Sequence, residues 1–375
     1  MKFETRKLGE LVINFDRKRV PLSSRQRSER QGVYPYYGAT SIMDYVDDYI
    51  FDGKYLLMGE DGTVIDENGK PILQIAEGKF WCNNHAHILQ NTELVTFDYL
   101  YYLLKNTNVQ SLVTGAVQPK ISQSNMNKLV LRIHKNKKEQ EKIARYLRLL
   151  DDKIELNSAI NNNLEQQAKT LYKDCFFDFS PFSNEGNLPD NWHIGTVGDI
   201  IQLHDSKRVP LSGSEREKME KIYPYYGATS LMDYVDNYLF DGIYLLLGED
   251  GTVVDSLGFP ILQYVYGQFW VNNHAHIITG KEGFSVEELY LFFSLTNIKS
   301  IVTGAVQQKV SQQNLKKVPA VIPSKEALSA FDDLIQPIFA QIRNLRDENA
   351  HLADLRDTIL PRLMSGELDV SAIDL

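Results

Sequence analysis

The stretch YPYYGATSIMDYVDDYIFDG spans residues 34–53, and the stretch YPYYGATSLMDYVDNYLFDG spans residues 223–242. The two lie 189 positions apart, and the same offset holds without a gap for residues 18–125 of the first copy. Over residues 34–88, 41 of 55 positions are identical to their counterparts. Because this period is too long for a solenoid repeat, the sequence predicts a tandem pair of similar domains.

The size and composition of the chain agree with two folded domains. A length of 375 residues leaves room for two domains with full cores, and 43% hydrophobic with 24% charged residues is ordinary for a soluble protein. The N-terminal sequence has scattered charges and no secretory apolar run, and no stretch of about 18 apolar residues predicts a membrane helix. Cys82 and Cys175 do not recur in the other copy, which favours reduced thiols in a cytoplasmic protein.

The net charge of -9 restricts how the chain could hold nucleic acid. Residues 1–190 contain 25 basic and 25 acidic residues, whereas residues 191–375 contain 15 basic and 24 acidic residues. Each neutralised phosphate needs a nearby Lys or Arg. If this chain binds DNA, we therefore expect partner subunits to neutralise part of the phosphate charge.

Each copy is predicted to be an α+β domain with a curved sheet. The segments YLLMGEDGTVID (residues 55–66) and KPILQIAEGKFW (residues 70–81) are rich in aliphatic and aromatic residues and are interrupted by Gly, as strands joined by turns would be. Each copy then ends in a helical pattern, FDYLYYLLKNT at 97–107 and VEELYLFFSLT at 286–296.

A long helical pattern follows each copy. Apolar or small residues alternate at steps of four and three, the heptad signature of a coiled-coil seam. In the first helix the seam is Ile143, Leu147, Leu150, Ile154, Asn157, Asn161, Leu164, Ala168 and Leu171. In the second it is Phe331, Ile335, Ile338, Ile342, Leu345, Asn349 and Leu352, followed by a change of phase to Leu355 and Ile359.

Two arrangements of these helices are open. They could pair as a coiled coil, in which Asn161 and Asn349 would fix the register, or each could pack only on its own domain. About 40 residues at about 1.5 Å each extend some 60 Å, longer than one such domain needs, which favours pairing. The predicted organisation is a first domain at 1–134, a helix at 135–178, a linker at 179–192, a second domain at 193–323, and a final helix and tail at 324–375.

The ordered set of these features resembles the specificity subunit of type I restriction-modification systems over essentially the whole chain. The features that carry the resemblance are the TGAVQxKxSQxN segment that closes each copy, the helix containing EQEKIARYLRLLDDKIELNSAINNNLE, the LPDNW before the second copy, and the terminal RDTILPRLMSGEL.

The resemblance implies two target recognition domains separated by two long helices that form an antiparallel coiled coil. It implies double-stranded DNA and two methyltransferase subunits as partners, no catalytic residues and no cofactor; it leaves open whether a restriction subunit is present. Family members commonly carry two dissimilar domains. Because these two are near-duplicates, we instead expect a bipartite target close to an interrupted palindrome, with half-site centres about 34 Å apart.

Four repeated motifs are candidates for DNA contact. The basic stretch after residue 16 could bind guanine or phosphate, although a solvated surface is the simpler explanation. The YPYYGAT tyrosines could reach phosphates, and its Gly could permit close approach, or these residues could be core. Asn in NNHAH could pair with adenine. The polar TGAVQxK segment could touch phosphates or cap the domain.

The residues predicted to contact DNA are Lys18, Arg19, Arg27, Tyr34, Tyr36, Tyr37, Gly38, Asn83, Asn84, His85, Gln118 and Lys120 in the first copy. Their counterparts are Lys207, Arg208, Arg216, Tyr223, Tyr225, Tyr226, Gly227, Asn272, Asn273, His274, Gln307 and Lys309.

Two alternatives remain beside the specificity-subunit interpretation. A metal-dependent enzyme could use HAH together with the carboxylates of GEDGT, since His85 and His87 would share one face of a strand; however, no third ligand has suitable spacing, and a hairpin turn explains Asp-Gly equally well. A free-standing DNA-binding regulator is the other alternative. The chain has no Walker A sequence, no amino-methyltransferase tetrapeptide and no dinucleotide loop, so any such chemistry is expected in partners.

Overall fold

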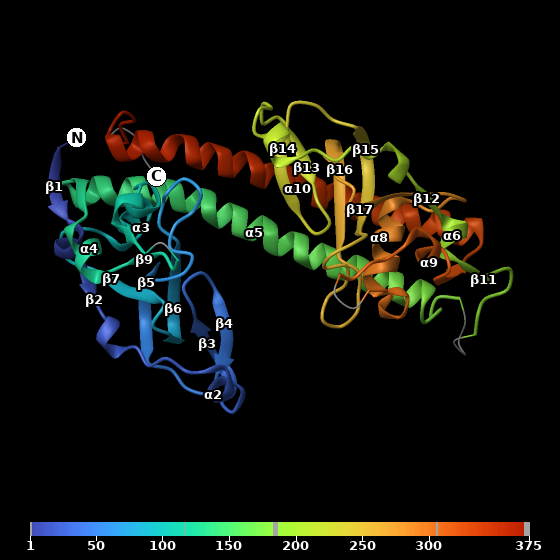
Figure 1. Ribbon diagram of the computed structural model, residues 1–375, viewed down its shortest axis with the longest axis horizontal. Helices are drawn as coiled ribbons and strands as arrows, with labels where there is room; N and C mark the ends of the chain where they lie inside the picture. Colours follow the sequence, from blue (N-terminus) through green and yellow to red (C-terminus); the bar gives the residue numbers. More distant parts are fainter. Residues whose placement is uncertain (1, 116, 183–186, 305–306, 371–375) are drawn as a thin grey trace. The chain divides into compact units, whose positions relative to one another are not determined.

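The computed structural model describes residues 2–115, 117–182, 187–304 and 307–370 (Figure 1). The chain divides into two compact units, the first formed by residues 1–156 and 348–375 and the second by residues 157–347. Each unit contains one copy of the repeat with part of both long helices. Because the units are defined by spatial contacts, each of them combines residues from several of the chain segments expected above.

The first domain is built on a six-stranded mixed sheet with the order β2-β7-β5-β6-β3-β4. All neighbours pair antiparallel except β3 and β6, which are parallel. The second half of the central strand β5, residues 55–59, is buried on both faces, which explains the apolar run YLLM there. The strands are β2 (Val12–Asn14), β3 (Gln31–Tyr37), β4 (Ile42–Val46), β5 (Phe51–Gly59), β6 (Leu73–Cys82) and β7 (Ala86–Asn91).

Smaller elements complete the first domain. Two short sheets pair β1 (Phe3–Lys7) with β10 (Val130–His134), and β8 (Val113–Thr114) with β9 (Lys120–Ile121). The helices are α1 (Leu8–Leu11), α2 (Ser24–Ser28), α3 (Phe97–Lys105) and α4 (Gln123–Lys128), with 3-10 turns η1 (Asp16–Lys18) and η2 (Gln110–Leu112). The helix expected at 97–107 is therefore present as α3.

The second domain repeats this plan with the strand order β12-β17-β15-β16-β13-β14. Its sheet consists of β12 (Ile201–Leu203), β13 (Tyr223–Tyr226), β14 (Leu231–Val235), β15 (Phe240–Gly248), β16 (Leu262–Val271) and β17 (Ala275–Gly280). The remaining elements are β11 (His193–Thr196), α6 (Val197–Ile200), η3 (Asp205–Lys207), α7 (Gly213–Arg216), α8 (Val286–Leu295), η4 (Lys299–Ile301), α9 (Gln312–Leu315) and β18 (Pro319–Ile322).

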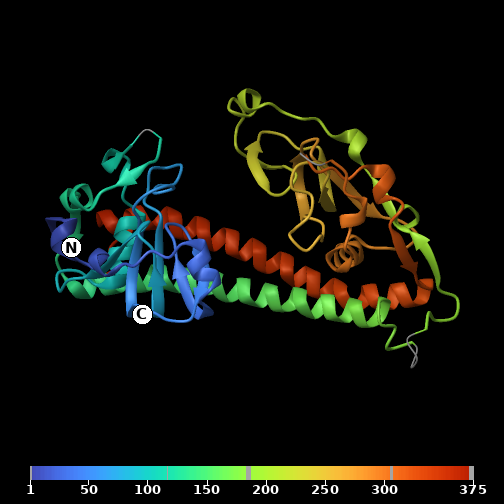
Figure 2. The ribbon, with the colours of Figure 1, turned by 60° about the horizontal axis from the view of Figure 1, so that its bottom comes forward.

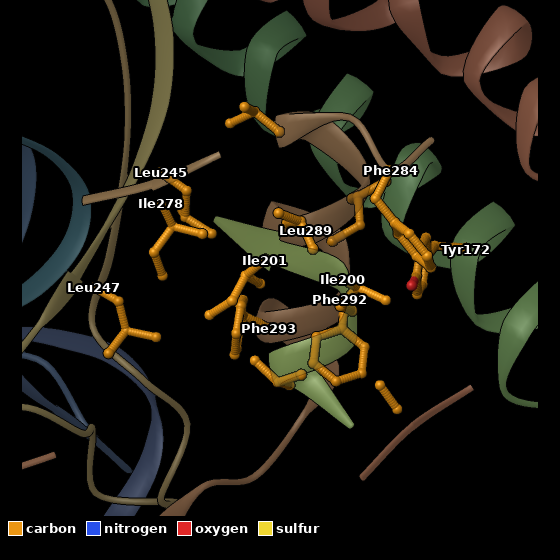
Figure 3. Close-up of a cluster of buried hydrophobic side chains, with 14 of the residues drawn as sticks. Tyr172, Ile200, Ile201, Leu245, Leu247, Ile278, Phe284, Leu289, Phe292 and Phe293 are labelled. Carbon is orange, nitrogen blue, oxygen red and sulfur yellow. The ribbon is translucent and has the colours of Figure 1, made fainter. Parts of the chain in front are cut away.

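The core of the second unit joins the sheet to the helices. Figure 3 shows Leu245 and Ile278 from the sheet facing Leu289 of α8, with Tyr172 on the helical side of the cluster. All four side chains are buried. Burial of apolar surface on this scale, about 25 cal/mol per Å², ties the domain to the helix that precedes it.

The two long helices are α5 (Lys137–Phe176) and α10 (Lys325–Ser365), and within each unit they lie side by side in both views (Figures 1 and 2). In the first unit Leu147 packs in one cluster with Leu360, and Asn349 donates a hydrogen bond to the Ile154 carbonyl at 3.3 Å. Residue numbers along α5 therefore increase as the numbers of the contacting residues of α10 decrease, so the two helices are antiparallel.

The second unit has the same sense, because the Tyr172 and Phe176 rings lie 5.5 and 4.8 Å from the Phe331 ring while Ala168 packs in one cluster with Ile342. The predicted fold class, two similar α+β domains each followed by a long helix and the helices packed together, is confirmed. At the seam, Asn157 and Asn161 are buried as expected.

One expectation for the seam and one for a turn were wrong. Leu355 is 49% exposed, and its neighbour Arg356 turns inward to pair with Asp151 at 2.6 Å. In the last turns of α5, Leu171 is half-buried and packs against the apolar cluster of the second unit, and Tyr172 beside it is buried.

The GEDGT segment is not the hairpin turn between β5 and β6. That turn lies farther on, where Asp66 N donates to Lys70 O at 2.8 Å and Gly69 takes a φ of 73°. GEDGT instead bridges to another segment, through the pair Asp61 and Lys120. Of the expected linker at 179–192, residues 183–186 lie outside the described residues.

Candidate nucleic-acid interface

Four segments far apart in the sequence converge at one end of the first sheet. Gly59 at the end of β5 pairs with Ala86 at the start of β7, so the segments beyond them leave the sheet together. The Phe15 N–H donates to the Ile88 carbonyl at 2.8 Å, which brings the turn after β2 to the same end. The Ile121 N–H donates to the Glu60 carbonyl at 2.8 Å and adds β9. We call residues 15–19, 59–63, 83–87 and 118–121 the first loop cluster.

A network of charged side chains ties this cluster together. Arg19 Nη1 lies 2.5 Å from Glu60 Oε2 and 2.7 Å from the Ala86 carbonyl oxygen. The second carboxylate oxygen of Glu60 lies 3.1 Å from Lys120 Nζ. Asp61 pairs with His85 Nδ1 at the rim. The basic stretch, GEDGT, NNHAH and TGAVQxK, which the sequence presents as separate motifs, are therefore parts of one site.

The base of the network is a buried Asp-His pair. His87 Nδ1 lies 2.6 Å from Asp16 Oδ2, and His87 Nε2 lies 2.8 Å from the Ile121 carbonyl oxygen. Both ring nitrogens therefore face oxygen atoms, one of a carboxylate and one of a backbone carbonyl, which hold the ring in place. Burial by itself would raise the pKa of Asp16, but hydrogen bonds from His87 and from the Ile88 N–H outweigh it and the pKa lies below its usual value.

The second domain repeats the network contact by contact. Arg208 Nη1 lies 2.6 Å from Glu249 Oε2, and His276 Nδ1 lies 2.6 Å from Asp205 Oδ2. Lys309 Nζ lies 3.4 Å from Glu249 Oε1. We call residues 204–208, 248–252, 272–276 and 307–310 the second loop cluster, and the structure describes all of them.

The groups Asp16, Glu60 and His87, and likewise Asp205, Glu249 and His276, are close enough together to hold a metal ion. The expectation that no third metal ligand has suitable spacing was wrong. The turns η1 and η3, which lie earlier in each copy, place Asp16 beside Glu60 and His87, and Asp205 beside Glu249 and His276. The contacts nevertheless do not fit a metal. Both nitrogens of His87 already face oxygen atoms, and the guanidinium of Arg19 lies against Glu60, where it supplies the compensating charge.

Some of the predicted contact residues are exposed at the rim of the clusters. Gln118 and Asn84 are exposed, His85 is partly exposed, and the side chain of Lys120 is 47% exposed. Lys18 is exposed, with its Nζ 5.2 Å from the Phe15 ring centroid. The same positions in the second domain have the same exposure: Lys207, Asn273, His274, Gln307 and Lys309.

Other predicted contact residues have structural partners. Asn83 is 4% exposed, and its side-chain oxygen accepts the His85 N–H at 2.8 Å. Tyr36 is 1% exposed, and its hydroxyl accepts the Leu22 N–H at 2.8 Å. Arg27 pairs with Asp44 at 3.1 Å. Counterparts with equivalent contacts are Asn272, Tyr225 and Arg216.

The tyrosines and the glycine of YPYYGAT lie beside the first loop cluster. Tyr34 and Tyr37 are half-buried, as are Tyr223 and Tyr226. A Cβ on Gly38 would lie 2.6 Å from Met43 Sδ, so Gly38 leaves room for the methionine side chain to pack against the backbone. Gly227 meets Met232 in the same way.

The site residues that the sequence interpretation missed are Asp16 and Asp205. A signal for them was present, since Asp is retained at this position in both copies while the next residue changes from Arg17 to Ser206. Nothing in the local sequence shows that this carboxylate lies beneath a histidine 71 residues away.

The fold is a doubled α+β module in which each copy carries a polar loop cluster built on the same charged network. Comparison with known proteins gives the particular family. The family described as type I restriction modification DNA specificity domain matches residues 1–166 and 189–350. The chain therefore belongs to the type I restriction-modification specificity-subunit family, whose members are non-catalytic DNA specificity subunits of these complexes.

Two relatives and one solved structure agree with this membership. The type I restriction enzyme MjaIX specificity subunit of Methanocaldococcus jannaschii is 25% identical, over 83% of this chain and 79% of the relative. The putative type I restriction enzyme specificity subunit S.HindORF215P of Haemophilus influenzae is 25% identical, over 85% and 83%. The crystal structure of the type I restriction-modification S subunit from M. genitalium has the same fold, with a TM-score of 0.59, 16% identity and coverage of 97% and 96%.

Among the helices of the part of the chain that the structure describes, none is long and apolar enough to cross a membrane.

Proposed function

We propose that the two loop clusters read the two halves of a bipartite DNA target that is close to an interrupted palindrome. The observation that carries this proposal is the repetition of the cluster itself. The side chains at its rim are the same residue types in both domains, and the network beneath them makes the same contacts. Similar surfaces are expected to select similar base sequences.

Within each cluster we assign different roles to the exposed and the enclosed residues. Lys18, Gln118 and Lys120 are exposed and are proposed to contact phosphates, and Asn84 is the exposed amide proposed to contact a base edge. Arg19 is proposed to hold the cluster in shape, because its donors are already used by Glu60 and by backbone carbonyls. The second domain carries the matching set: Lys207, Gln307, Lys309, Asn273 and Arg208.

The long helices supply the second part of the proposal. Two-fold symmetry in a protein is matched by inverted repeats in duplex DNA, and an antiparallel pair of helices is the element that could relate two like domains in this way. The proposed half-site centres are about one helical turn, roughly 34 Å, apart.

Methyltransferase subunits, two per chain, are proposed to dock on the helices. Leucines outside the seam support this assignment, because 49–55% of each side chain is exposed although the residues are large and apolar: Leu149, Leu156, Leu334 and Leu355.

Single-molecule methylome sequencing of cells with and without this gene tests the proposal. We expect one methylated motif to disappear with the gene, and its two specific halves to be inverted copies or nearly so. Two unrelated halves would contradict the proposal, and so would an unchanged methylome. In the second case the chain would not direct methylation at all.

A further inference from the structure

The hairpin of β3 and β4 forms one end of the first sheet, and the hairpin of β13 and β14 forms the same end of the second. In each sheet, β4 or β14 is the outermost strand of the described residues, so one of its edges has no strand partner. Proteins usually cover or blunt such an edge, because its free N–H and C=O groups can pair with another chain.

Large apolar side chains are exposed on this hairpin in both domains. In β4, Ile42 is 40% exposed, Met43 52% and Tyr45 49%. Successive residues of a strand point to opposite faces, so exposure of both Ile42 and Met43 means that neither face is covered at the start of β4, whereas Val46 at its end is buried. We call the following residues the hairpin surface: Val33, Ile42, Met43 and Tyr45, with Ile222, Leu231, Met232 and Tyr234 in the second domain.

The charge around the hairpin surface is unfavourable for DNA. Residues 31–53 contain four Asp and no Lys or Arg, and the equivalent residues 220–242 contain one Glu, three Asp and one Lys. The nearby cations are paired with these carboxylates: Arg27 with Asp44 at 3.1 Å, Arg30 with Asp47 at 2.9 Å and with Asp48 at 3.8 Å, and Lys221 with Asp233 at 2.8 Å. Phosphates need cations, whereas Tyr, Met and Ile are typical of the centre of protein interfaces.

The sequence of the hairpin is retained in both copies, whereas the sequence of the segment that precedes it is not. Residues 34–53 are identical to 223–242 at 17 of 20 positions, whereas residues 24–33 match 213–222 at one of ten. Packing in the core explains why buried residues are shared, and the Met43 sulfur also accepts a hydrogen bond from Asn83 at 3.4 Å, but neither explains the shared Tyr45, which is half exposed. The same exposed pattern displayed twice indicates that the same partner binds twice.

We infer that the hairpin surface of each domain docks one methyltransferase subunit, through an apolar patch on that subunit bordered by Lys or Arg. This inference rests on the proposed function, which supplies a protein partner in two copies. It adds a contact at the edge of each recognition domain, distinct from the helices and adjacent to the loop cluster, which Met43 and Met232 touch through Asn83 and Asn272. The acidic border selects the partner by charge, and the apolar centre provides the affinity.

Lysine substitution in the hairpin surface distinguishes a protein partner from DNA by the sign of the effect. The variants are Tyr45→Lys, Tyr234→Lys and both together, in the full chain, mixed with the purified methyltransferase subunit of the same system. Association is measured by native mass spectrometry and by sedimentation. Each single variant is expected to weaken binding of one of the two subunits about 10-fold, and the double variant to weaken both.

Ile13→Lys is the matched control. Ile13 is 49% exposed on β2, the strand at the opposite edge of the same sheet, and its substitution should leave association unchanged. Circular dichroism and the melting temperature of each free variant establish that it folds. Met43→Lys is a second variant of the same surface should Tyr45→Lys not fold.

Each outcome supports or overturns the inference. Weakened association with unchanged DNA binding by the free chain supports it. If lysine instead strengthens DNA binding and leaves association unchanged, the surface faces DNA. If it abolishes self-association of the free chain, the occupant is a second copy. Unchanged association overturns the inference alone, whereas a wild-type chain that binds no methyltransferase subunit overturns the proposed function.

Discussion

The two domains are nearly the same at their loop clusters and different where they meet the helices. At the loop clusters, Arg19 and Arg208 pair with equivalent carboxylates. Arg19 Nη1 lies 2.5 Å from Glu60 Oε2, and Arg208 Nη1 lies 2.6 Å from Glu249 Oε2. At the helices, β16 presents Tyr264 and Tyr266 where β6 has Ile75 and Glu77.

The attachment of the second domain uses these tyrosines. The Tyr264 hydroxyl donates to Glu287 Oε1 at 2.6 Å, and the Tyr266 hydroxyl donates to Asp347 Oδ1 of α10 at 2.8 Å. Arg343 of α10 completes the contact by pairing with Glu287 at 3.0 Å.

Both domains also attach to α5 through a tyrosine of the helix after the sheet, since the Tyr290 hydroxyl of α8 donates to Glu165 Oε1 at 2.6 Å. The first domain has this type of attachment without the strand tyrosines. There the Tyr102 hydroxyl of α3 donates to Asp151 Oδ2 of α5 at 2.6 Å, and Arg356 of α10 pairs with the same carboxylate. Glu77, the counterpart of Tyr266, is exposed. The two domains therefore keep the same side chains at the loop clusters, which are proposed to face similar half-sites. They differ in the side chains that contact unequal halves of the two long helices.

The largest expected effect comes from the network that the two domains share. His87→Leu removes the side chain that lies 2.6 Å from the enclosed Asp16 carboxylate, and a buried charge that loses its partner typically costs about 3–5 kcal/mol. His276→Leu should cost the same in the second unit. Urea denaturation monitored by fluorescence measures both, and a difference of more than about 1 kcal/mol between them would break the comparison.

A buried carboxylate makes the second unit sensitive to pH in a way that the first is not. Burial raises the pKa of Glu288 to about 8, and nearby Asp332 adds to the shift although hydrogen bonds from Ser285 oppose it. The folded state therefore holds a proton that the unfolded chain has lost, so stability falls as the pH rises from about 4.5 to about 8, by at most a few kcal/mol.

Melting temperatures across that pH range test this dependence. Glu288→Gln should remove the part of the decrease that belongs to the second unit. The first domain has Tyr99 at this position, so Tyr99→Phe serves as the control and should leave the slope unchanged.

Tyr264, which has no tyrosine counterpart in the first domain, should contribute less to the free energy of unfolding than the shared network. Tyr264→Phe removes the hydroxyl that donates to the enclosed Glu287, with an expected loss of about 1–2 kcal/mol in denaturation measurements. Tyr244→Phe in the same sheet is the control, since its hydroxyl makes no hydrogen bond in the described chain and its loss should cost less than about 0.5 kcal/mol. Equal losses would show that the Glu287 contact adds nothing.

The exposed lysines at the rims of the two clusters should contribute equally to the salt dependence of DNA binding. Lys120→Gln and Lys309→Gln each remove one proposed phosphate contact, so the slope of log K against log salt should fall by about 0.9 for either variant. Lys128→Gln, an exposed lysine of α4 outside the cluster, is the control. A reduced slope for only one of the rim variants would show that the clusters do not bind alike.

Removal of metal should have no effect on either domain. Because Arg19 and Arg208 already neutralise the carboxylates of the two networks, dialysis against a chelator is expected to leave the melting temperature and DNA affinity unchanged. A decrease that zinc or another divalent metal restores would revive the alternative of a metal centre.

Much of the architecture could be predicted because it depends on periodic patterns. The 189-residue offset indicated two like domains, and the spacing of Ile143 and Leu147 indicated a helix seam before any contact was known. The seam was less certain at its ends, where Arg356 turned inward instead of Leu355 because its charge is compensated by Asp151. Heptad spacing contains no information about such a partner.

The sequence by itself determined the duplication, the α+β class, the long helices and the chemical types at each candidate site, since these follow from local composition and spacing. Only the tertiary structure decided which candidates act together. Asp16, Glu60 and His87 are separated by tens of residues and meet because strand register brings the ends of β2, β5 and β7 to one side of the sheet. It also decided which repeated residues are buried, as Tyr36 is, and which are exposed, as Tyr45 is, because burial depends on neighbours from distant segments.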